Sequence, residues 1–179
     1  PRPQLVRSEW QSLNGLWEYA IRLRTAPPPE RNFDGEILVP FSITSALSGV
    51  MSRVGSENKL WYRRTFSVSD DWTNGRVLLH FGAVDWSASV WVNGERVGSH
   101  QGGYTPFSCD ITAALNDTGQ QELLVSAWDP TDEGFQPRGK QVRRPRGIWY
   151  TPTTGIWQTV WIETVPDTYI RSIRTRPDL

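Results

Sequence analysis

The stretch from residue 129 to residue 154 holds most of the side chains that could recognise a polar ligand. It shows no clear period and is rich in Pro, Gly and Arg. A loop longer than about 15 residues inside a compact domain is uncommon and is often functional. Its hydrogen-bond donors are Gln136, Arg138, Lys140 and Gln141, which could bind hydroxyl groups or a carboxylate.

Aromatic side chains near the end of this stretch could add a stacking surface. Trp149 and Tyr150 are adjacent, and each ring offers a flat apolar face to a ligand. The alternative is a docking loop, because interfaces between domains use the same Arg and aromatic residues. The sequence favours neither interpretation over the other. Charge runs are usually surface features, so we interpret the basic run over 143–146 as a solvated loop.

A second candidate is the pair Asp85-Trp86, just before a predicted hairpin. The carboxylate could accept hydrogen bonds from ligand hydroxyls while the indole stacks on the ligand. The alternative, which we favour, is a turn aspartate that accepts backbone N–H groups beside a core Trp.

Other chemistries have no support in the sequence. The chain has one cysteine, Cys109, so an internal disulfide and a metal–thiolate cluster are excluded. His80 and His100 have no partners at metal-ligand spacing, and we expect both to be structural. Nucleophile-elbow and phosphate-loop motifs are missing as well. We therefore expect no metal, no cofactor and no catalytic residue in this chain.

The net charge and the hydropathy of the chain limit the classes of partner that it could bind. The 179 residues carry 19 Lys plus Arg and 19 Asp plus Glu, so the formal charge is zero. This balance does not favour a nucleic acid or a membrane surface as partner. No apolar run approaches the roughly 20 residues that span a bilayer.

The candidate residues must be positioned by strands. Residues 86–92 and 95–100 alternate around Asn93-Gly94, a pair that suits a type I′ hairpin turn. Asn14-Gly15 and Asn74-Gly75 give two further hairpin signals. Further strands are predicted over 15–24, 36–39, 60–68, 77–81, 121–128 and 156–163, with another beginning in 169–174. Short strands separated by turn signals predict a single all-β domain, a β-sandwich of the jelly-roll kind with few short helical turns.

Five segments, in this order, carry a family resemblance. They are LNGLWEYAI (13–21), VPFSI (39–43), LWYRRTFSV (60–68), the central stretch from FGAVDW (81–86) through WVNGERVG (91–98) to GGYTPFSCDIT (102–112), and GIWQTVWIE (155–163). Together they resemble the N-terminal sugar-binding domain of glycoside hydrolase family 2, the family of β-galactosidases, β-glucuronidases and β-mannosidases. The likeness extends over almost the whole chain.

The resemblance implies a jelly-roll domain of galactose-binding-domain type that occupies residues 1–179, with the start of the next domain at 167–179. It implies a bacterial-type, β-galactosidase-like parent enzyme that cleaves β-linked sugars with retention. The two catalytic carboxylates would lie in a (β/α)₈ barrel outside this chain. This domain would brace that barrel and contribute the 129–154 loop to the pocket wall.

The resemblance also sets the expected ligand and partners. The ligand would be a carbohydrate, bound by Gln136, Arg138, Lys140, Gln141, Trp149 and Asp85. The partner would be the downstream barrel of the same polypeptide, and a homo-oligomer of the parent stays open. The compartment also stays open, and could be the bacterial cytoplasm, the periplasm or the outside of the cell. Two alternatives remain: a stand-alone carbohydrate-binding module and a purely architectural domain without ligand contact.

Overall fold

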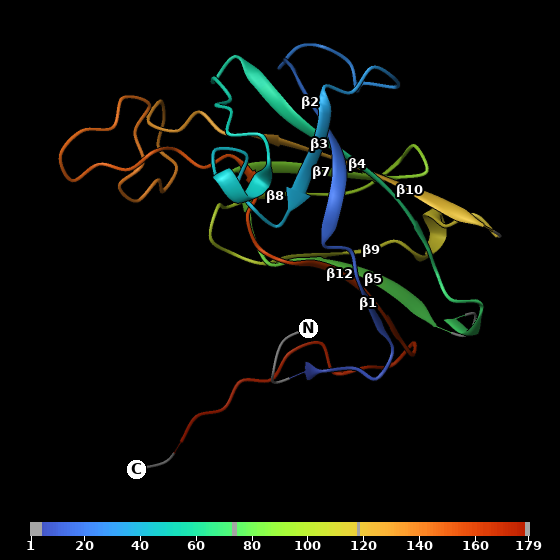
Figure 1. Cartoon of the computed structure of the whole chain (residues 1–179). Coiled ribbons are helices and arrows are strands. Elements are labelled where there is room, and N and C mark those ends of the chain that lie inside the picture. Colours follow the sequence, from blue (N-terminus) through green and yellow to red (C-terminus); the bar gives the residue numbers. More distant parts are fainter. Residues whose placement is uncertain (1–4, 73–74, 118, 178–179) are drawn as a thin grey trace.

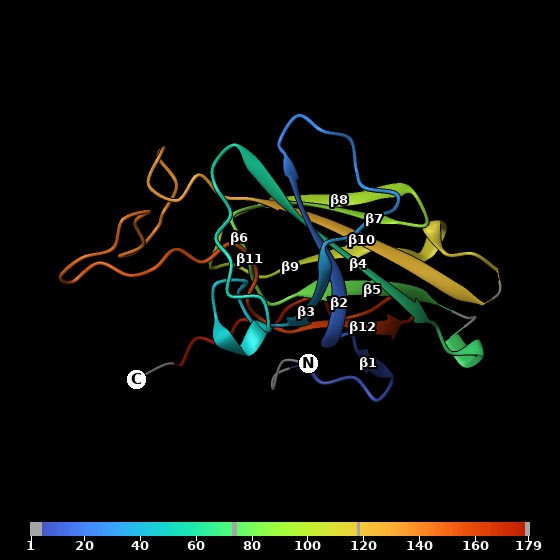
Figure 2. The same cartoon turned by 45° about the horizontal axis from the view of Figure 1, so that its top comes forward.

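The computed structural model describes residues 5–72, 75–117 and 119–177, and these form an all-β sandwich. Two antiparallel sheets face each other, and a two-stranded ribbon lies at one end (Figures 1 and 2). The predicted jelly-roll sandwich is confirmed. The helical segments with defined bounds are short 3₁₀ turns, η2 (Ala46–Ser48), η3 (Asp70–Trp72) and η4 (Thr112–Ala114).

The strands are short and pair mostly with distant partners. The larger sheet has the order β3 (Gly35–Val39), β2 (Gly15–Leu23), β4 (Asn58–Ser67), β10 (Gln120–Trp128), β7 (Ser87–Val92), β8 (Glu95–Gln101). The smaller sheet has the order β1 (Trp10–Ser12), β12 (Val160–Val165), β5 (Arg76–Phe81), β9 (Phe107–Asp110). The ribbon pairs β11 (Gly155–Ile156) with β6 (Val84–Asp85).

Alternation along the strands explains which face each sheet buries. In β7 every second residue is buried, and the residues between are half-buried. Such a period of two places one set of side chains between the sheets and the other toward solvent. The turn after β7 is formed by Asn93 and Gly94, whose φ angles of 50° and 83° match the predicted type I′ hairpin.

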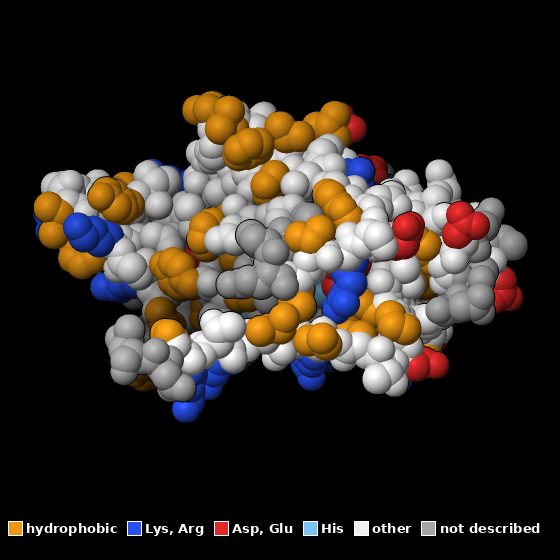
Figure 3. Space-filling model, turned by 90° about the horizontal axis from the view of Figure 1, so that it is seen from below, with side chains coloured by type: hydrophobic (Ala, Val, Ile, Leu, Met, Phe, Trp, Pro, Cys, Tyr) orange, Lys and Arg blue, Asp and Glu red, His pale blue; other side chains and the backbone are white. Residues whose placement is uncertain are grey.

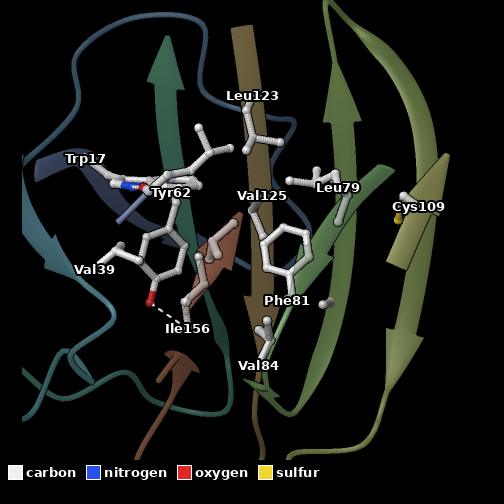
Figure 4. Close-up of a cluster of buried hydrophobic side chains, with 14 of the residues drawn as sticks. Trp17, Val39, Tyr62, Leu79, Phe81, Val84, Cys109, Leu123, Val125 and Ile156 are labelled. Atoms are coloured by element: carbon white, nitrogen blue, oxygen red, sulfur yellow. Dashed lines mark hydrogen bonds between the residues drawn. The ribbon is translucent and has the colours of Figure 1, made fainter. Parts of the chain in front are cut away.

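The core lies between the two sheets and contains a buried tyrosine. Trp17 and Tyr62 meet edge to face, with ring centroids 6.3 Å apart. The Tyr62 hydroxyl accepts a hydrogen bond from the backbone N–H of Ile156 at 3.1 Å (Figure 4). Burial raises the pKa of Tyr62, so this hydroxyl stays protonated. The contact ties the larger sheet to the ribbon at the end of the sandwich.

Some sequence expectations were wrong at the edges of the fold. Asn14-Gly15 does not close a hairpin, because the flanking strands β1 and β2 belong to different sheets. The Asn14 side chain instead bonds the other end of the chain, accepting from the N–H of Val160 at 3.0 Å. In the described residues 166–177 no strand forms, so the strand predicted to begin in 169–174 is not present. Asn74 lies outside the described residues.

Candidate functional site

The 129–154 loop projects from one end of the sandwich as an arm, drawn in orange in Figure 1. It connects β10 to β11, and none of its residues belongs to a named strand, as the sequence predicts. Its only described ladder contact is an isolated parallel bridge between Gln141 and Tyr150. The bridge closes an outer lobe, residues 142–149, which we call the arm lobe.

Asp85 lies at the base of the arm and is only 4 % exposed. Strand β6 places it there, next to β11. Its Oδ2 accepts hydrogen bonds from Gln141 Nε2 at 3.2 Å and Thr153 Oγ1 at 3.3 Å. The favoured interpretation as a turn aspartate bonded to backbone N–H groups was wrong. Asp85 belongs to a short strand, and among the described residues its carboxylate accepts hydrogen bonds from two side chains of the arm.

The environment of Asp85 disfavours its charged form. Burial raises the pKa of Asp85 to about 6, and the negative charge of Asp129 adds to this. The two hydrogen bonds from the arm oppose the shift only in part. Asp129 is also buried, and desolvation raises its pKa as well. The base of the arm therefore contains two carboxyl groups that gain protons more readily than exposed ones.

Gln141 joins several groups at the base of the arm. Its Nε2 donates to Asp85 and, at 3.4 Å, to the hydroxyl of Tyr104. Its Oε1 accepts from both the backbone N–H and the hydroxyl of Thr153. Asp85, Tyr104, Gln141 and Thr153 form what we call the arm node. Tyr104 is 49 % exposed, so the node opens to solvent through its hydroxyl group.

A glycine allows the node to form. A Cβ atom on Gly103 would lie 2.4 Å from Asp85 Oδ1, closer than real Cβ contacts allow. The carbonyl of Gly103 accepts a hydrogen bond from Trp157 Nε1 at 2.8 Å, and the Trp157 ring meets Tyr104 edge-on. The backbone before Tyr104 is thus fixed from two sides.

The other predicted ligand residues form cation–aromatic pairs along the arm. The Arg138 guanidinium lies 5.8 Å from the Trp149 ring centroid, and Lys140 Nζ lies 5.8 Å from that of Tyr150. Trp149 and Tyr150 are 39 % and 63 % exposed. Both pairs therefore face solvent, where an apolar ring and a cation are presented together.

The structure separates Gln136 from this group. Its Nε2 donates to the carbonyl of Thr131 at 2.9 Å, so it closes a turn at the start of the arm. Sequence reasoning missed Tyr104 and Thr153, which complete the node. The Gly-Gly-Tyr sequence at 102–104 is the one local signal that could have marked Tyr104, since it places a large side chain after two permissive residues.

The arm node can donate and accept hydrogen bonds, and the cation–aromatic pairs can stack on a ring. Among the described residues no group of three or more His, Cys, Asp or Glu side chains is placed to hold a metal ion. Nor does any described helix have the length and apolarity needed to cross a membrane.

Comparison with known proteins decides the family. The model for the sugar-binding domain of glycosyl hydrolases family 2 matches residues 39–134, more than half of the chain. The chain belongs to glycoside hydrolase family 2. A β-galactosidase from Thermoanaerobacter pseudethanolicus is 35 % identical over 114 residues, which is 63 % of this chain and 14 % of that protein. A β-glucuronidase from Felis catus is 27 % identical over 197 residues, or 92 % of this chain and 30 % of that protein.

Solved structures of two bacterial β-glucuronidases share the fold. The crystal structure of Ruminococcus gnavus β-glucuronidase superposes with a TM-score of 0.68 at 21 % identity, covering 91 % of this chain and 30 % of that one. Faecalibacterium prausnitzii β-glucuronidase gives 0.67 at 24 % identity, covering 94 % and 33 %. The chain thus spans about a third or less of the length of these proteins.

Proposed function

We propose that this family 2 domain is the N-terminal sugar-binding and scaffold domain of a larger, retaining, β-galactosidase-like glycoside hydrolase. The catalytic acid/base and nucleophile would come from a barrel in the same polypeptide, and residues 167–179 would begin the domain that follows. Such an enzyme needs two carboxylates facing each other across the glycosidic bond. Here the buried carboxylates of the arm base are held by side chains of the arm, Asp85 by Gln141 and Thr153 and Asp129 by Thr131 and Thr154, which supports a positioning role for both.

The observation that carries this proposal is the arm node at the open end of the sandwich. Asp85 and Gln141, 56 positions apart in sequence, meet at 3.2 Å, and the Tyr104 hydroxyl lies beside them. A carboxylate, an amide and a hydroxyl side by side match the alternating donors and acceptors of a sugar. The Trp149 and Tyr150 rings supply the apolar contact. In this arrangement the arm forms one wall of a pocket that the barrel completes.

Steady-state kinetics of the full-length enzyme test the wall. Tyr104→Phe removes one exposed hydroxyl group and no buried contact. Loss of one hydrogen bond to the sugar is expected to lower kcat/KM for a β-galactoside by about three- to tenfold. The double variant Arg138→Ala/Lys140→Ala should lower it as well. Tyr169→Phe, at a half-buried position outside the arm, is the matched control and should keep the parental value.

The two alternative roles, an architectural domain and a stand-alone binding module, predict different results. If the domain is purely architectural, kcat/KM stays unchanged in Tyr104→Phe and in the Arg138/Lys140 variant. That result would contradict the proposal that the arm forms a wall of the substrate pocket. A stand-alone binding module would bind galacto-oligosaccharides saturably without the barrel. Calorimetric titration of the 179-residue chain tests that role, because a wall that is completed only by the barrel predicts no measurable binding.

A further inference from the structure

The arm is the basic part of a neutral domain. From Asp132 to Tyr150 the chain has five Lys or Arg residues and two carboxylates, so the segment carries 5 − 2 = +3, whereas the whole chain sums to zero. In Figure 3 hydrophobic and basic side chains gather at the left end of the molecule, the end where the arm projects in Figure 1.

Only one of the five cations is neutralised within the described structure. Arg143 pairs with both local carboxylates, at 2.7 Å from Asp132 Oδ1 and in close contact with Glu133. Throughout the described residues, no carboxylate forms an ion pair with the other four cations, which are Arg138, Lys140, Arg144 and Arg146. The arm thus keeps four positive charges that no carboxylate neutralises; one of them, Arg138, also donates a hydrogen bond to the carbonyl of Asp132 at 3.2 Å.

The four unpaired cations and the two buried carboxyl groups lie in different places, the first along the arm and the second at its base. Asp85 and Asp129 are buried at the base, beside the sandwich. Arg144 and Arg146 belong to the arm lobe, beyond the bridge that joins Gln141 to Tyr150. An acidic ligand group placed at the base would be repelled, whereas the same group at the lobe would be attracted. A ligand that runs along the arm should therefore be uncharged near Asp85 and negative further out.

We infer that the arm recognises an acidic glycan whose negative charge, a uronic carboxylate or a sulfate ester, lies on a sugar unit beyond the neutral unit held at the arm node. This inference rests on the proposed function and names the substrate class of the same site. Arg138 over Trp149 and Lys140 over Tyr150 suit such a ligand, because each pair offers a ring for the sugar face and a cation for its acid group.

The alternative is that these four cations bind an acidic surface of the neighbouring domain and not a glycan. The pairing of each ring with a cation favours a glycan, since one pair offers a stacking face and a positive charge to the same sugar. A protein face would hold the arm lobe permanently, so in that case reversing its charges would destabilise the full-length protein without changing ligand preference.

Binding measurements on the full-length enzyme test the inference without requiring turnover. Calorimetric titration would use three thio-linked trisaccharides of equal length that glycosidases do not cleave: a neutral one, one with a distal uronic carboxylate and one with a distal sulfate. The test variant is Arg144→Glu/Arg146→Glu. Its control is Arg31→Glu/Arg174→Glu, which makes the same change in net charge at exposed positions outside the arm.

We expect at least one acidic trisaccharide to bind about tenfold more tightly than the neutral one at low salt, and the arm variant to lose that preference. The control should keep it, and the two acidic probes show whether carboxylate or sulfate is the better ligand. Equal binding of all three probes, or equal loss in both variants, would overturn the inference. If kcat/KM still falls in Tyr104→Phe, the pocket wall stands and only the acidic substrate class is lost.

Discussion

Asp85 Oδ2 accepts a hydrogen bond from Gln141 Nε2 at 3.2 Å, and this contact attaches an otherwise irregular arm to strand β6 of the ribbon. Gln141 also holds Thr153, at the other end of the arm, through its amide oxygen. One side chain therefore fastens both sides of the arm to the rigid part of the fold.

Gln141→Ala is expected to loosen the arm and leave the sandwich intact. It removes hydrogen bonds to Asp85 and Thr153 but no core contact. Amide hydrogen exchange in residues 142–153 should accelerate about tenfold or more, while the melting temperature changes little. Gln120→Ala, on an exposed strand position, is the control and should leave exchange in the arm unchanged. Unchanged protection of the arm in Gln141→Ala would contradict its anchoring role.

Asp85 is expected to make stability depend on pH. Its pKa is about 6 in the folded chain, above the usual value near 3.8, so folding favours the protonated form. Its contribution to stability is fully present below about pH 4 and is lost as pH rises through 6, by up to roughly 3 kcal/mol. Asp129 adds a change of the same sign.

Asp85→Asn should remove most of this pH dependence. The measurement is urea unfolding of both proteins at several values between pH 4 and pH 7.5. The difference between the two free energies of unfolding should grow in favour of Asp85→Asn as pH rises. Parallel curves would mean that Asp85 titrates normally and that its burial is compensated.

Gly103→Ala is expected to disturb the arm node through a steric clash with Asp85. The new methyl group would lie 2.4 Å from Asp85 Oδ1, so one of the two must move. Overpacking of this kind costs about 1–3 kcal/mol. In an Asp85→Ala background the same substitution should cost at least about 1 kcal/mol less, as measured by a double-mutant cycle in urea. Additive effects would show that the two sites do not interact.

Tyr62→Phe is expected to destabilise the sandwich with little change in shape. It removes the hydroxyl that accepts the Ile156 N–H and leaves that buried donor without its partner. The expected cost is about 1–3 kcal/mol, seen as a lower urea midpoint with an unchanged slope. Tyr19→Phe, at a half-buried position of β2, serves as the control. A loss of the same size in both variants would assign the effect to general packing.

The sequence predicts the fold well because strand patterns are local. Alternation around Asn93-Gly94 is sufficient to place β7 and β8, since both turn residues tolerate positive φ. Asn14-Gly15 shows the limit of this reasoning. The same dipeptide connects two sheets, because the Asn14 side chain bonds residues about 145 positions away in the sequence.

The candidate site was predicted only in part, because some of its features are local in the sequence and others are contacts between distant residues. The arm is visible in the sequence as a long stretch without a period, and so are its cations and rings. The partnership of Asp85 with Gln141 and Thr153 is not, because it joins residues 56 and 68 positions apart and depends on β6 pairing with β11. The role of Gly103, which has no side chain and so leaves space for that carboxylate, also cannot be predicted from the sequence, because it depends on the folded position of Asp85.

A crystal structure of the full-length enzyme with an uncleaved thio-linked β-glycoside in its active site would show directly whether the arm contacts the sugar. We expect the sugar to lie within about 3.5 Å of polar atoms of the arm node, Tyr104 among them, and in contact with an arm ring. A sugar enclosed by the barrel alone, with every atom of the arm more than about 8 Å away, would contradict this expectation.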